Sequence, residues 1–128
     1  MSEIVRLFAV MRSRKKFAAF FVATFLAFAA VVSLQLGPFI ASRKINDMDW
    51  HRSATPKEQR ETAHEALCLW FGDPHDAFIV LLLHGDQSSI PYLRKALAFA
   101  PEPTGLEMCT WRHGRDALAR LTSANHPD

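Results

Sequence analysis

The hydrophobic pattern of this chain is dominated by one uninterrupted apolar run near the N-terminus. Residues 17–36 are almost all Phe, Ala, Val and Leu, and no charged residue occurs from position 17 to position 41. Twenty residues of α-helix extend about 30 Å, the thickness of the hydrocarbon layer of a bilayer. A core helix of this length would need a polar face, and the run has none. The pattern predicts a transmembrane helix over 17–36, ended by Gly37 and Pro38.

An amphipathic pattern begins after a short polar stretch. Residues 37–54 are predicted to form a juxtamembrane linker, with Trp50 at the membrane interface. The next helix begins at a capping box formed by Thr55 and Glu58, with Pro56 at the first helical position. Its apolar residues recur at helical spacing before a break at Gly72, and they are Ala63, Ala66, Leu67, Trp70 and Phe71.

The following segment is apolar without periodicity. Asp73 and Pro74 repeat the start signal of the previous helix, with Asp73 as the cap. Residues 77–83 are then apolar on every side, which predicts an element buried all round, either a central helix or a core strand.

Two more helices are predicted before the C-terminus. One covers residues 90–100 and tolerates a proline in its first turn, and the other covers residues 110–122. Gly114 lowers the stability of the last helix by up to about 1 kcal/mol relative to Ala, which suggests either close packing against a neighbouring helix or neutral sequence drift. The predicted fold is all-α, with a domain of four short antiparallel helices over 55–128.

One part of this domain matches a known repeat pattern. Gly85-Asp-Gln-Ser-Ser-Ile-Pro-Tyr-Leu-Arg-Lys-Ala-Leu97, followed by Asp116-Ala-Leu-Ala-Arg-Leu121, resembles one HEAT-type helical repeat. Such repeats carry a Gly-Asp turn, a helix of the form Ile-Pro-x-Leu-x-x-Ala-Leu and a second helix ending in Ala-Leu-x-x-Leu. Glu65-Ala66-Leu67 with Gly72-Asp73 resembles the end of a preceding repeat, so the resemblance covers about residues 63–122.

The chain departs from the repeat pattern in two places. The loop from Phe99 to Cys109 is longer than usual, and Trp111 stands where such repeats often carry Arg. Fewer than three repeats are present, whereas solenoids generally need three. The resemblance implies a protein-interaction module rather than a catalyst, because stacked helix pairs leave surfaces for partners.

The charge distribution indicates an orientation in the membrane. Residues 1–16 hold five basic residues and one acidic residue, and three basic residues, Arg43, Lys44 and Arg52, follow the apolar run. The positive-inside rule then predicts a cytoplasmic N-terminus and an extracytoplasmic domain. The basic residues directly before the run, which also suit anionic lipid headgroups, are Arg12, Arg14, Lys15 and Lys16.

A cleaved signal peptide is the alternative to a permanent anchor. Ala27-Phe28-Ala29 has the small-x-small form of a cleavage site. Cleavage there would leave Ala30–Leu36 as an apolar new N-terminus, so the sequence favours the uncleaved anchor. Small residues at every fourth position (Ala19, Ala23 and Ala27) also form a ridge of the kind that lets membrane helices pack closely, which leaves homo-oligomerisation open.

Composition narrows the function classes. The chain has 128 residues, is 49% hydrophobic and 22% charged, and carries a net charge of +2. It is too apolar for a disordered chain, and residues 42–128 are slightly acidic, which disfavours nucleic acid as a partner. Asp73, Asp76 and Asp86 lie at predicted turns and caps, where Asp stabilises backbone N–H groups, so no catalytic residue and no cofactor are predicted.

Cysteine and histidine provide the remaining candidate chemistry. Each cysteine has a histidine four residues away: His64 with Cys68, and Cys109 with His113. This spacing puts both groups of a pair on one helix face, so the four residues could form a Cys2His2 metal site, although the usual zinc spacings are missing. In an oxidising compartment, a Cys68–Cys109 disulfide is a stronger expectation than the metal site, and two separate buried thiols are the alternative to it. The disulfide would close a loop of about 40 residues and stabilise the domain by about 3–4 kcal/mol.

Overall fold

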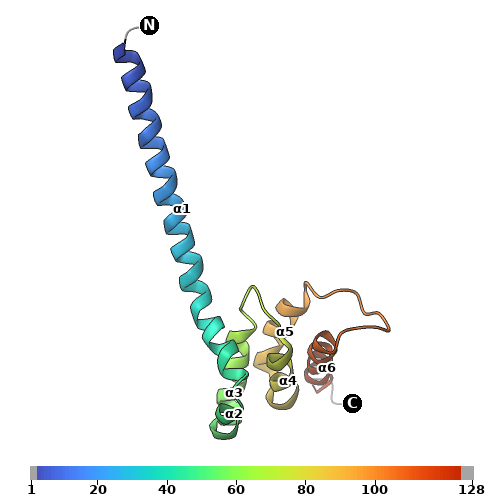
Figure 1. The fold of residues 1–128 in the computed structure, drawn as a ribbon. Coiled ribbons are helices and arrows are strands. Elements are labelled where there is room, and N and C mark those ends of the chain that lie inside the picture. Colours follow the sequence, from blue (N-terminus) through green and yellow to red (C-terminus); the bar gives the residue numbers. More distant parts are fainter. Residues whose placement is uncertain (1–2, 125–128) are drawn as a thin grey trace. The chain divides into compact units, whose positions relative to one another are not determined.

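The computed structural model of this protein describes residues 3–124, and side chains are described from Ser13 onward. Within this part of the chain the structure is helical and has no strand, which confirms the predicted all-α class. One long apolar helix is followed by several short ones (Figure 1). The elements are α1 (Glu3–Ile45), α2 (Met48–Ser53), α3 (Pro56–Ala66), α4 (His75–His84), the 3-10 helix η1 (Gln87–Ser89), α5 (Ile90–Leu97) and α6 (Cys109–Ser123).

The chain divides into two compact units, Met1–Leu34 and Gln35–Asp128. Most of the apolar run belongs to the first unit, where its large side chains stand exposed along α1. The segment Ser13–Ile45 of α1 has a mean hydropathy of 2.4 over its most apolar window, and none of that window is buried. Among the described residues, this is the one helix long and apolar enough to cross a membrane.

The helix end predicted at Gly37-Pro38 is wrong, because α1 continues through both residues to Ile45. A proline inside a helix costs about 3 kcal/mol. Burial offsets this cost here, since Ala41 and Ile45 belong to the hydrophobic core of the second unit. The segment 37–54, predicted as a linker, therefore holds the last turns of α1 and the short helix α2, which Asp47 caps through its side chain.

The capping box predicted for α3 is confirmed. Thr55 Oγ1 accepts from the backbone N–H of Glu58, and the Glu58 carboxylate accepts from the backbone N–H of Thr55. The helix is shorter than predicted and ends at Ala66, so Trp70 and Phe71 lie in the following loop, where both are exposed. Gly72 has a φ of 110°, a backbone conformation that strongly favours glycine, and it turns the chain toward α4.

The core of the second unit forms around α4. This helix packs most extensively against α6 and also against α3, while α5 packs on α6 (Figure 1). Residues 77–83 form a helix rather than a strand, and Phe78 and Leu81 are fully buried. The prediction that this segment is buried all round is wrong at Leu83, which is 66% exposed.

The close packing predicted at Gly114 is confirmed. A Cβ atom at this position would lie 3.0 Å from Leu97 Cδ2 and 3.0 Å from two ring carbons of Phe78. The glycine therefore lets α6 approach both α4 and α5. Leu93, Ala117 and Leu121 complete the buried centre of the unit.

Candidate functional site

Cys109 and His113 come together as their spacing predicts. Both lie on α6, one turn apart, and Cys109 Sγ is 2.9 Å from His113 Nε2. The Cys109 side chain is exposed and that of His113 is half-buried. A thiol and an imidazole on one helix face therefore form a pair of potential metal ligands at the surface.

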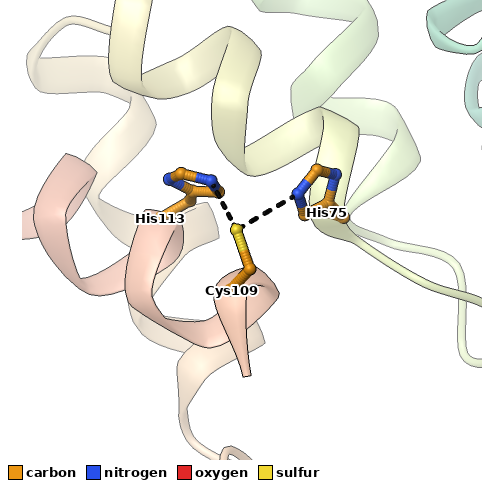
Figure 2. Close-up of side chains that lie close together, drawn as sticks. All are labelled: His75, Cys109 and His113. Atoms are coloured by element: carbon orange, nitrogen blue, oxygen red, sulfur yellow. Dashed lines mark hydrogen bonds between the residues drawn. The ribbon is translucent and has the colours of Figure 1, made fainter. Parts of the chain in front are cut away.

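A third ligand comes from a different helix. His75, the first residue of α4, places its Nε2 3.7 Å from Cys109 Sγ. Figure 2 shows the sulfur between the two imidazole rings, with His113 from the same helix as the cysteine and His75 from α4. One ligand atom from each of the three residues lies within 4.8 Å of the others. The sequence analysis missed His75, because it lies 34 residues before Cys109 and only the packing of α4 on α6 brings it close.

His64 and Cys68, the other two residues of the predicted metal set, have different partners. His64 is buried, its Nε2 lies 2.8 Å from Ser89 Oγ, and its ring stacks on Tyr92 with centroids 4.3 Å apart. Cys68 Sγ donates to the backbone carbonyl of His64, one turn back in the chain. Among the described residues, the Cys109–His113 pair gains His75 instead, so the four-residue site is not assembled.

Burial lowers the pKa of His64. Removal from water disfavours the charged imidazolium, and Arg60 acts in the same direction, whereas the carboxylates of Asp86 and Glu61 oppose the shift. Ser89 Oγ already accepts from the backbone N–H of Asp86, so its hydroxyl hydrogen is available for an unprotonated His64 Nε2. His64 is therefore a neutral core histidine with a structural role.

The three-residue cluster of His75, Cys109 and His113 is held in place by two aspartates. Asp76 Oδ1 lies 2.8 Å from His75 Nδ1. Since a carboxylate only accepts, Nδ1 carries a hydrogen, and in the neutral ring the lone pair is then on Nε2, the atom nearer Cys109. Asp73 Oδ1 accepts from the backbone N–H of His75 at 3.0 Å and from Thr110 Oγ1 at 3.2 Å. Asp73 thus links the first residue of α4 to the first turn of α6.

Both cysteines are free thiols, Cys68 half-buried and Cys109 exposed. The structure therefore does not confirm the disulfide between them. Of the predicted topology residues, Arg14, Lys15 and Lys16 are exposed on α1, and the Arg12 side chain lies outside the part of the chain whose side chains are described.

The second unit also contains a cavity of about 370 Å³. Its wall is formed by residues of the loop after α3 and of α5, together with Ile45 at the end of α1 and Trp111 on α6. Three aromatic side chains that line it, Trp70, Phe71 and Phe99, are 63–89% exposed, and we call them the aromatic rim. The ligands of the histidine and cysteine cluster do not line this cavity.

Comparisons of the chain with family models, curated proteins and solved structures found no match. The fold and the site themselves define the class: an all-helical protein with one candidate membrane helix and a compact helical unit that carries a surface cluster of two histidines and a cysteine.

Proposed function

We propose that this chain is a single-pass membrane protein without catalytic activity. Its N-terminus lies in the cytoplasm, and its helical unit is displayed on the extracytoplasmic side, where it binds a protein partner at the membrane surface. The observation that carries this proposal is the exposure of the apolar side chains along the first part of α1.

The exposed apolar side chains are too large and too many for a surface in water. Phe17, Phe20, Phe25 and Phe28 are each 65–69% exposed, and the smaller residues between them add no charge. A soluble protein rarely exposes a contiguous apolar surface of this kind, whereas a lipid bilayer solvates it. An uncleaved helix in lipid satisfies both the length and the exposure of this segment.

The orientation rests on the flanking charges. Five basic residues precede the apolar run, within residues 1–16. Three follow it: Arg43, Lys44 and Arg52. Basic residues close to a span are retained on the cytoplasmic side. The helical unit would then be translocated.

The aromatic rim and its cavity are the surface that best suits a protein partner. The HEAT-like pattern of the helices favours an interaction role, since stacked helix pairs present surfaces rather than catalytic clefts. Trp and other aromatic residues are enriched where proteins bind one another. We infer that an apolar side chain of the partner enters the cavity between Trp70 and Phe99.

The membrane part of the proposal is tested with a topology reporter fused after residue 128. A reporter that functions only outside the cytoplasm should be active, and a reporter that functions only inside should be silent. The protein should also stay in the membrane fraction at its full mass after alkaline carbonate washing. Activity of the cytoplasmic reporter would contradict the orientation, and a shortened, soluble product would show a cleaved signal peptide.

The interaction part is tested by site-specific photocrosslinking in intact membranes. A photoreactive residue at Phe99 should give one discrete protein adduct. The additional substitution Phe71→Ala in the same chain should weaken this adduct, because it removes part of the aromatic rim. The control position is Ala119, which is exposed on α6 and does not line the cavity. Equal adducts from both positions, or none from Phe99, would contradict the assignment of this surface.

A further inference from the structure

We propose that His75, Cys109 and His113 bind one zinc ion, with the fourth coordination position left to water or to an exogenous ligand. The metal set predicted from the sequence contained two of these residues and lacked the third. The inference does not depend on the proposed function, because none of the three ligands lines the cavity, although Asp73 and Asp76 contribute to its wall.

The ligand spacing is close to that of a tetrahedral zinc site. Zn–S bonds of about 2.3 Å and Zn–N bonds of about 2.0–2.1 Å place sulfur and nitrogen ligands about 3.5 Å apart. The two distances from Cys109 Sγ, 2.9 Å to His113 Nε2 and 3.7 Å to His75 Nε2, bracket that value. Small side-chain rotations would therefore bring all three atoms to one ion.

The cluster also has the outer contacts expected of a metal site. A histidine ligand usually donates its second ring N–H to a carboxylate or a carbonyl, which fixes the ring and its tautomer. Asp76 provides this contact to His75 through Nδ1. His113 is placed by its position one turn after Cys109, and Asp73 bridges the two helix starts. The backbone therefore positions the ligands before any ion arrives.

The donor atoms decide which metal fits. One thiolate and two neutral imidazoles suit zinc, whereas magnesium and calcium prefer oxygen ligands. Binding replaces the thiol hydrogen of Cys109 by the metal and releases one proton to the solvent. A thiolate with two imidazoles carries a charge of −1, so the bound site has a net charge of +1. Three protein ligands leave one position open, and the exposure of Cys109 gives the ion a path from solvent.

The test uses the full chain in detergent micelles, purified without a histidine tag, fully reduced and stripped of metal. Zinc is titrated against a chromophoric chelator, and we expect one equivalent bound per chain. Cys109→Ser, His113→Asn and His75→Asn should each weaken zinc binding at least tenfold. The matched controls are Cys68→Ser and His84→Asn, the latter at the opposite end of the same helix as His75. Both should bind zinc like the unaltered protein.

Cobalt substitution reports directly on the sulfur ligand. We expect a thiolate-to-cobalt charge-transfer band that Cys109→Ser abolishes and Cys68→Ser retains. Far-ultraviolet circular dichroism confirms that each variant is folded. The absence of a bound equivalent of zinc, or a cobalt band that depends on Cys68, would overturn the proposal and leave the cluster as a thiol–imidazole hydrogen bond.

Discussion

The side chain of Gln35 holds the loop that contains Trp70. Gln35 Oε1 accepts from the backbone N–H of Trp70 at 2.8 Å, and Gln35 Nε2 donates to the carbonyl of Cys68 at 3.4 Å. The glutamine is only 7% exposed. A buried amide with these partners belongs to the helical unit, although the sequence pattern includes it in the spanning segment. The first compact unit therefore ends at Leu34, although Leu36, Phe39 and Ile40 on the next turns of α1 are still 47–55% exposed.

Replacing Gln35 by Leu should destabilise the helical unit by about 1–3 kcal/mol, because the backbone groups of Trp70 and Cys68 lose their buried partner. All three tryptophans lie in this unit, so urea unfolding followed by tryptophan fluorescence in micelles measures it. Ser33→Leu is the control, since Ser33 is exposed and bonds only to its own helix at Ala29. Equal stabilities of the two variants would contradict a structural role for Gln35.

Gly114→Ala should destabilise the unit by up to about 2 kcal/mol. The added methyl group would stand 3.0 Å from Leu97 and Phe78, and overpacking of a core costs about 1–3 kcal/mol, from which the gain in helix propensity of about 1 kcal/mol is subtracted. Thermal unfolding followed by circular dichroism gives the change. Gly105→Ala has no atom within 4 Å of the new Cβ and should leave the melting temperature unchanged. A neutral or stabilising Gly114→Ala would show that α6 moves freely away from α4.

The stability of the helical unit should fall as the pH decreases from about 7.5 to 5.5. Burial lowers the pKa of His64 below its ordinary 6.5, so in this range the unfolded chain binds a proton that the folded chain excludes. Stability therefore rises with pH. His64→Gln should flatten this part of the dependence. The measurement is the free energy of unfolding at several pH values, and parallel curves for His64→Gln and the unaltered protein would refute the assignment.

Asp76→Ala should weaken zinc binding by about 10–100-fold, if the proposed site is correct, without removing a ligand. The carboxylate orients His75 through Nδ1, and its loss frees the ring to turn away from Cys109. The cobalt charge-transfer band should persist at saturating metal, since the sulfur ligand is intact. Asp116→Ala removes an exposed carboxylate from α6 and serves as the control. An unchanged affinity in Asp76→Ala would mean that the carboxylate does not position His75.

Replacing the four basic residues directly before the apolar run by Gln should invert the protein in the membrane. One basic residue would then remain on the N-terminal side against three after the run, so the positive-inside rule favours the opposite orientation. Paired reporters fused after residue 128 give the outcome. Replacing Arg43 and Lys44 instead should leave the orientation unchanged. The four residues to replace are Arg12, Arg14, Lys15 and Lys16.

Local signals in the sequence predicted most of the helix starts. The capping box at Thr55 acts within one turn of backbone, so no distant contact is needed to place the start of α3. The last helix begins at Cys109, close to the predicted residue 110. The prediction that Asp73 caps α4 is wrong by one residue, because Pro74 is the N-cap, without a side-chain cap bond, and Asp73 accepts from the backbone N–H of His75. The apolar run has no polar face, and this too can be read from the order of its residues. The Cys109–His113 pair follows from helix periodicity in the same way.

Helix ends and the site depended on distant contacts. Sequence signals at Gly37-Pro38 favour a stop, but burial of Ala41 and Ile45 extends α1 beyond it. The apolar spacing of Trp70 and Phe71 favours a helix. The backbone N–H of Trp70 instead donates to the Gln35 side chain, and the segment forms a loop.

The sequence by itself predicted an all-α fold but left residues 77–83 open as helix or strand, and it determined that the chain carries an apolar segment long enough to span a bilayer and that Cys109 and His113 share a helix face. Only the tertiary structure decided that His75 joins them and that His64 and Cys68 do not. The physical reason is that helix periodicity fixes neighbours three and four residues apart, whereas contacts across 34 residues depend on which helix faces pack together, and here Gly114 sets the close approach of α4 and α6.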